Sequence, residues 1–144
     1  MADSRGMRNN NPLNIRRERR NRWQGMAATQ TDRRFVQFSS LRMGYSAAFV
    51  LLRNYMDKGV NTIGRIIRRW APAADNNDTL GYIDYVSRMA GTEADEPLRF
   101  ADEQRMVDMV CAMAQMETGT VADRHIVEQG YLLALEAGKE ETRK

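Results

Sequence analysis

Residues 102–119, DEQRMVDMVCAMAQMETG, contain the helix on which the predicted fold depends. Apolar residues recur there at three- and four-residue spacing, which predicts a helix over residues 102–117 that ends at Gly119. At about 100° per residue, the methionines, valines and alanines share one face, and most acidic and amide side chains lie opposite. Glu117 breaks this division, because it projects to about 20° from Met106, in the middle of the apolar face.

A carboxylate on an apolar helix face has a structural and a functional explanation, and the sequence leaves both open. In the structural one, the helix ends just before Glu117, or Glu117 pairs with one of the many arginines, because charged carboxylates are rarely buried alone. In the functional one, apolar neighbours desolvate the carboxyl group, raise its pKa and keep it protonated as a general acid. The glycine two residues later would then open the end of the helix to a cleft.

Spacing and capping residues predict four further helices and one β-hairpin. The helices are expected at about residues 41–58, 62–70, 79–89 and 123–137. The hairpin pairs residues 23–28 with residues 34–38, where aromatic and β-branched side chains favour strands, around a turn at residues 29–32. The predicted fold is therefore α+β but mostly helical. We expect a single domain, residues 1–144, with flexible ends at residues 1–8 and 138–144.

The sequence argues against several kinds of chemistry. Cys111 is the only cysteine and His125 the only histidine, so neither a disulfide nor a Cys/His zinc cluster can form within the chain. Serine-hydrolase, phosphate-binding and dinucleotide-binding motifs are missing, and we expect no metal and no cofactor. Residues 1–11 lack the apolar run of a signal peptide, and no stretch is apolar enough to span a membrane. We therefore expect synthesis in the cytoplasm and no membrane partner.

Charge is distributed unevenly along the chain, although the net charge is only +3. Residues 1–70 hold 15 Lys/Arg and 4 Asp/Glu, whereas residues 71–144 hold 7 and 15. A basic half of this kind suits a polyanionic partner such as nucleic acid or an acidic polymer. The two halves could equally fold against each other and partly neutralise, so charge alone does not identify a partner.

Short motifs resemble the lysozyme-like superfamily of peptidoglycan-cleaving enzymes, which includes lytic transglycosylases, muramidases and glucosaminidases. The tripeptide ETG at residues 117–119 is similar to the E-S/T-G that closes their catalytic helix. The segment NNPLNI at residues 10–15, followed by Trp23, Gly25 and Phe38, looks like their N-N-x-F-G-I…W-x-G…F segment.

Two further segments extend this resemblance. The segment RWAP at residues 69–72, followed by Thr79, Tyr82 and Val86, is similar to the W-x-P…T-x-x-Y-V of lytic transglycosylases. The opening NNNPLNIR at residues 9–16 resembles small phage-encoded virion proteins of lysozyme-like type. In the enzymes the glutamate helix precedes the asparagine motif and hairpin, whereas here it follows them. The resemblance therefore implies a circularly permuted lysozyme-like domain.

The resemblance implies cleavage of the β-1,4 bond between amino sugars of peptidoglycan, with Glu117 as the general acid. A hydrolase would usually add a second carboxylate at about 5–9.5 Å. Asp32 in the predicted hairpin turn is the candidate, and an aspartate there could equally be structural. Without a second carboxylate, Glu117 would act as acid and then base while the 6-hydroxyl group of the sugar attacks, as the likeness to lytic transglycosylases implies.

Five further residues are candidates for substrate binding, each with a structural alternative. Tyr82 would lie near the reacting sugar if the transglycosylase segment carries over, or in the core of its helix. Asn10, Asn11 and Asn14 could hydrogen-bond N-acetyl groups, or they could only shape the turn before the hairpin. Trp23 could stack on a sugar or pack in the core.

Three hypotheses follow for the function. The leading one is a phage- or prophage-derived domain that binds peptidoglycan and cleaves it with Glu117. The second is a non-catalytic structural or accessory protein of the virion with the same fold, whose partners are other virion proteins. The third is an Arg-rich nucleic-acid-binding module, which the sequence supports less well.

Overall fold

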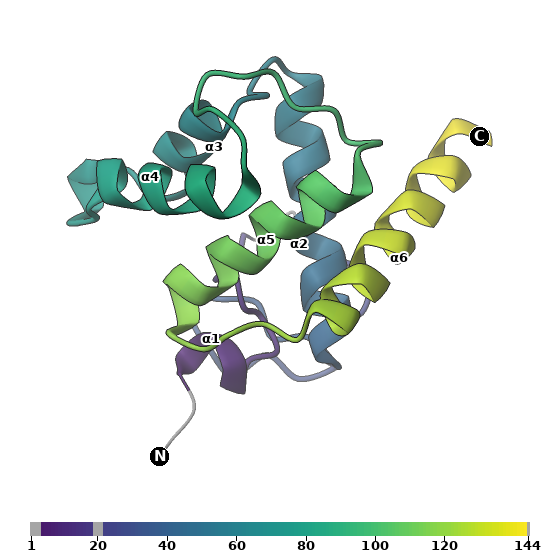
Figure 1. The fold of residues 1–144 in the computed structure, drawn as a ribbon. Coiled ribbons are helices and arrows are strands. Elements are labelled where there is room, and N and C mark those ends of the chain that lie inside the picture. Colours follow the sequence, from purple (N-terminus) through teal and green to yellow (C-terminus); the bar gives the residue numbers. More distant parts are fainter. Residues whose placement is uncertain (1–3, 19–21, 144) are drawn as a thin grey trace.

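The computed structural model describes residues 4–18 and 22–143, and this part of the chain is mostly helical, as predicted (Figure 1). Its elements are α1 (Arg5–Arg8), α2 (Leu41–Asp57), α3 (Ile63–Trp70), the 3-10 helix η1 (Ala73–Asp75), α4 (Thr79–Ala90), α5 (Glu103–Thr118) and α6 (Arg124–Arg143). None of the helices in the described part is long and apolar enough to cross a membrane.

Helix α5 crosses the middle of the molecule and packs against both α4 and α6 (Figure 1). The side chain of Asp102 caps its first turn by accepting a hydrogen bond from the backbone N–H of Arg105, and Gly119 ends it with a φ of +72°. The predicted apolar face is buried completely, with an exposed fraction of 0% at Met106, Met109, Val110 and Met113. The helix also includes Glu117, so it does not end before that residue.

A cluster of aromatic rings holds α6 against α2. The ring of Phe49 on α2 meets the ring of Tyr131 on α6 edge-on, with centroids 5.3 Å apart, and the ring of Phe100 contacts both. The Tyr131 hydroxyl donates a hydrogen bond of 2.7 Å to the carbonyl oxygen of Phe100. Gly130 lets the two helices approach closely, because a Cβ there would lie 2.6 Å from that of Tyr45. The segment before α5 is thereby joined to both helices.

The predicted β-hairpin at residues 23–38 is wrong as a pair of strands. Two isolated antiparallel bridges stand in this region of the described chain, and they join Arg16 to Phe35 and Met26 to Phe38. Side chains replace much of the ladder: the Gln30 amide donates 2.7 Å to the carbonyl oxygen of Gln37, whose own N–H donates 2.8 Å to Gln30 Oε1. Local side-chain bonds of this kind compete with strand pairing, and strand propensity does not register them.

Both ends that we expected to be flexible contain helix in the structure. Helix α1 lies within residues 1–8, and α6 continues past residue 137 to Arg143. The side chain of Ser4 caps α1 by accepting a hydrogen bond from the backbone N–H of Met7. The organisation of residues 1–144 as one domain stays a prediction.

The asparagine-rich turn packs against the start of α2. The side chain of Asn11 is fully buried and donates hydrogen bonds to the carbonyl oxygens of Ile15, at 3.0 Å, and Val36, at 2.9 Å. Gly44 in α2 lies directly against the same turn, because a Cβ at this position would overlap the carbonyl oxygen of Asn10. The turn is therefore fixed in place by both its own side chains and the helix behind it.

We predict that Gly44→Ala lowers the free energy of unfolding by about 1–3 kcal/mol, the usual cost of overpacking. In an open helix the same change would favour folding, because alanine has the higher helix propensity. The exposed change Asn54→Ala in the same helix is the control, and it should leave stability almost unchanged. Urea denaturation followed by circular dichroism measures both, and a Gly44→Ala protein as stable as the parent would contradict the close packing.

Candidate active site

Glu117 lies in the last turn of α5, where its carboxyl group is partly buried. Its Oε1 accepts a hydrogen bond of 3.0 Å from the side-chain amide of Asn14, a residue 103 positions earlier in the chain. Glu117 forms no ion pair with any arginine of the described residues, so its charge is not neutralised by a salt bridge there. The structural explanation based on an arginine partner therefore does not apply within the described part of the chain.

The backbone of the turn aims Asn14 at this carboxyl group. Asn14 has a φ of +53°, in the left-handed region that asparagine tolerates better than most residues. Its backbone N–H donates a 3.0 Å hydrogen bond to the carbonyl oxygen of Asn11, which closes the turn. Gly6 in α1 leaves room for the side chain, since a Cβ there would lie 2.9 Å from Asn14 Oδ1.

Tyr82 reaches the same carboxyl group from helix α4. Its side chain is only 5% exposed, and its hydroxyl donates a 3.4 Å hydrogen bond to the carbonyl oxygen of Met113. The same hydroxyl group is close enough to the Glu117 carboxyl group to lower its pKa. Asn14 and Tyr82, from different parts of the chain, thus both influence this carboxyl group.

The surroundings of Glu117 favour its protonated form. Burial raises the pKa of Glu117 above its usual range, and the hydrogen bonds from Asn14 and Tyr82 offset only part of this effect. Burial and the nearby Glu117 carboxyl group also raise the pKa of Tyr82 well above its usual value, so the tyrosine keeps its proton and remains a donor. This is the environment expected of a general acid.

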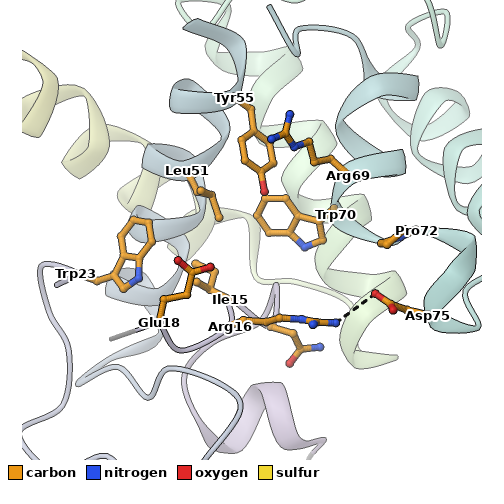
Figure 2. Close-up of a pocket in the computed structure, with 11 residues that line it drawn as sticks. Ile15, Arg16, Glu18, Trp23, Leu51, Tyr55, Arg69, Trp70, Pro72 and Asp75 are labelled. Carbon is orange, nitrogen blue, oxygen red and sulfur yellow. Dashed lines mark hydrogen bonds and ion pairs between the residues drawn. The ribbon is translucent and has the colours of Figure 1, made fainter. Parts of the chain in front are cut away.

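Figure 2 shows a cavity of about 290 Å³ whose lining includes Asn14 but neither Glu117 nor Tyr82. Asn14 lines the cavity and bonds Glu117, so it links the two. Three aromatic side chains, from Trp23, Tyr55 and Trp70, form much of the wall. The indole N–H of Trp70 is fixed by the carbonyl oxygen of Leu13 at 3.0 Å, whereas that of Trp23 is buried and lacks a partner in the described part of the chain.

Charged residues complete the cavity wall. Arg16 and Asp75 pair at 3.4 Å across one side, and Glu18 lies close to Trp23 (Figure 2). Arg69 lies over the ring of Tyr55, with its guanidinium carbon 5.5 Å from the ring centroid. Aromatic faces combined with charged hydrogen-bonding groups suit a carbohydrate with polar substituents. Within the described residues, no group of three His, Cys, Asp or Glu side chains could hold a metal ion.

The candidate residues from the sequence divide into two groups. Glu117, Asn14 and Tyr82 come together, and Trp23 lines the adjoining cavity. Asn10 instead donates 3.1 Å to the carbonyl oxygen of Phe38, and Asn11 is buried in the turn. Both therefore shape the turn that presents Asn14.

Asp32 also serves the framework in this structure. Its carboxylate pairs with Arg5 at 2.6 Å and accepts hydrogen bonds from the side chain of Asn9 and the backbone N–H groups of Arg34 and Phe35. These four partners hold the pKa of Asp32 well below its usual range. Its role as the second carboxylate stays a prediction. The contacts that its oxygens already make argue against this role.

Sequence reasoning missed several residues of the cavity. Glu18 and Asp75 are two carboxylates that line it, yet neither stands in a motif. Tyr55 fits the apolar pattern of its helix, so the spacing alone predicts a core residue. Trp70 stands in the RWAP segment, and the resemblance of this segment to lytic transglycosylases was the one indication that Trp70 lies near the site.

Comparison with known proteins gives one informative relative. The chain is 35% identical over 120 residues to protein P5 of Pseudoalteromonas phage PM2, and the alignment covers 81% of this chain and 72% of that protein. No protein-family model matches the chain. The phage type that residues 9–16 implied is thereby confirmed, whereas the lysozyme-like relationship stays a prediction.

We predict that Glu117→Gln stabilises the protein at high pH. The pKa of Glu117 is higher in the folded protein than in the unfolded chain, where it is about 4.5. Its neutral carboxyl group therefore contributes fully to the free energy of unfolding below about pH 4.5. This contribution is lost as the pH rises through the folded-state pKa. Glutamine stays neutral, so the melting temperature of Glu117→Gln should match the parent near pH 4 and exceed it at pH 8. A difference that does not change with pH would contradict the buried, protonated carboxyl group.

Asp32→Asn should show the opposite pH dependence. The lowered pKa of Asp32 gives stability that is present above about 3.8, its pKa in the unfolded chain, and is lost as pH falls through the folded-state value. The variant should therefore melt below the parent at pH 7, and the gap should narrow as the pH falls below about 3.8. Thermal denaturation over the same pH series measures this. An Asp32→Asn protein as stable as the parent at pH 7 would show that the four contacts contribute little.

Proposed function

The chain belongs to the same family as protein P5 of Pseudoalteromonas phage PM2, and for this phage-type protein we propose cleavage of the β-1,4 glycosidic bond of peptidoglycan. One observation carries the proposal. The carboxyl group of Glu117, whose pKa is raised, accepts a hydrogen bond from Asn14, and Asn14 also lines a cavity with aromatic walls. A general acid next to a carbohydrate-sized cavity is the minimum that such a reaction requires.

The relative positions of the motifs support the lysozyme-like resemblance. Asn14 precedes Glu117 by 103 residues, yet the two side chains are in hydrogen-bond contact. A circularly permuted domain needs this proximity, because permutation changes the order of elements along the chain but keeps their places in the fold. Tyr82, from the segment that resembles lytic transglycosylases, meets the same carboxyl group.

In the proposed reaction, protonated Glu117 gives its proton to the glycosidic oxygen as the C1–O bond breaks and positive charge develops at the sugar ring. Asn14 orients the carboxyl group through its hydrogen bond, and both Asn14 and Tyr82 stabilise the carboxylate that forms, because both lower the pKa of Glu117. The burial that raises the pKa of Glu117 keeps the acid protonated closer to neutral pH.

The second half of the reaction determines the product. Asp32 is occupied by Arg5 and Asn9, which favours the route without a second carboxylate. The Glu117 carboxylate then takes the proton of the 6-hydroxyl group, whose oxygen bonds to C1 and closes a 1,6-anhydro ring. Activation of water by Glu18 or Asp75, which line the cavity, is the hydrolytic alternative.

A second function is favoured by the phage relative itself. As a structural or accessory protein of the virion, the chain would keep this fold and bind other virion proteins without cleaving anything. Association with the virion is part of both proposals, because a phage protein that acts on the wall from outside must travel with the particle.

We predict that Glu117→Gln lowers turnover of purified peptidoglycan by about 10²–10⁴-fold, the usual contribution of a general acid. Asn14→Ala and Tyr82→Phe should give smaller losses and raise the pKa seen in the pH–rate profile, because each removes a bond to the carboxylate. Mass spectrometry of the released fragments distinguishes 1,6-anhydro ends from reducing ends.

Glu103→Gln is the matched control, because Glu103 is an exposed glutamate at the other end of α5. This variant should cleave as fast as the parent. Equal activity of Glu117→Gln and the parent would remove Glu117 from the mechanism. No cleavage by the parent protein would favour the structural role in the virion.

A further inference from the structure

A second cavity adjoins the one beside Glu117 and has a different character. Its volume is about 350 Å³, and three arginines, Arg17, Arg22 and Arg33, line it. Glu18 lines both cavities, so they lie on either side of the same short segment. Among the described residues that line the second cavity, Glu18 is the only acidic one. The cavity is therefore a concave, basic surface next to the proposed cleavage site.

The three arginines differ in how they are held. Arg17 is fixed, because its guanidinium group donates 2.9 Å to the carbonyl oxygen of Asp32 and its backbone N–H donates 2.7 Å to the carbonyl oxygen of Arg34. Arg22 and Arg33 are exposed, and neither has a hydrogen-bond or ion-pair partner in the described part of the chain. The nearby carboxylate of Asp32 already forms an ion pair with Arg5. Two guanidinium groups are thus available to an external anion.

We propose that Arg22 and Arg33 bind carboxylate groups of the peptidoglycan strand whose glycosidic bond lies at Glu117. This inference rests on the proposed function and adds a binding site to it. Peptidoglycan differs from a neutral β-1,4 glycan such as chitin by its peptide substituents, which carry free carboxylates. Guanidinium groups pair with carboxylates through two parallel hydrogen bonds, so arginine suits this recognition better than a neutral side chain.

The shape of the site favours this partner over duplex DNA. Strong binding to DNA takes roughly 6–10 phosphate contacts spread along the duplex. Here two arginines without partners in the described part of the chain line a cavity that shares Glu18 with the aromatic-walled cavity. A branched glycan with one anionic group near each cleavage point matches this arrangement.

The test compares Arg22→Gln/Arg33→Gln with a control, Arg88→Gln/Arg99→Gln, which removes two exposed arginines that line neither cavity. Each pair is also placed in Glu117→Gln, so that binding is measured without cleavage. The probes are purified sacculi, the same sacculi with their carboxylates converted to amides, chitin, and a duplex DNA fragment. Co-sedimentation gives the affinity at low and at moderate salt.

We expect Arg22→Gln/Arg33→Gln to bind native sacculi about tenfold more weakly, a loss within the range of one charged hydrogen-bond pair. The parent and the variant should bind amidated sacculi equally weakly. Their affinities for chitin should also be equal. The control should behave as the parent. The proposal would be overturned if the variant bound native sacculi as tightly as the parent, or if it lost as much affinity for chitin as for sacculi. It would also be overturned if the two arginines contributed to tighter binding of DNA than of sacculi, or if the parent did not bind sacculi.

The outcomes separate this inference from the proposed function. If the parent cleaves peptidoglycan but the arginine variant binds sacculi normally, the cleavage proposal stands and the carboxylate site is wrong. If binding depends on Arg22, Arg33 and the carboxylates but no cleavage occurs, the site stands and the protein is a wall-binding component of the virion.

Discussion

The burial of one face of α5 is the constraint on which both the fold and the site depend. Four of its side chains are completely removed from solvent, and each such burial contributes about 1.5–3 kcal/mol. The helix therefore cannot turn about its axis or move along it without a large loss of stability. Glu117 shares this face, so the packing that favours the core also places a carboxyl group where water is scarce.

A carboxyl group in such a place needs specific partners, and the chain supplies them from distant segments. Asn14 comes from a turn that Asn11 and Gly44 hold in position, and Tyr82 comes from the neighbouring helix α4. These donors stabilise the ionised form without removing the effect of burial on the pKa. The structure therefore combines rigid placement of Glu117 with a pKa above the usual value of a glutamate.

Periodicity predicted the helices well because burial of an apolar face is recorded in the local spacing of residues. It also marked Glu117, since a carboxylate on that face stands out within one helix. The partners of Glu117 could not be predicted in the same way. Asn10 and Asn14 share a turn and a left-handed backbone, yet one bonds Phe38 and the other bonds Glu117. The prediction of a hairpin was wrong for a similar reason, because the side chain of Gln30 bonds the backbone of Gln37 where a strand ladder was expected.

The hydrogen bond between Asn14 and Glu117 also has a consequence for when the protein can act. It closes a loop of roughly a hundred residues, and contacts of such long range form late because the chain entropy must be lost first. A nascent chain on the ribosome carries Asn14 long before α5 exists, and an incompletely folded chain lacks the tie altogether. The pairing of Asn14 with Glu117 therefore exists only in a completely synthesised and folded molecule.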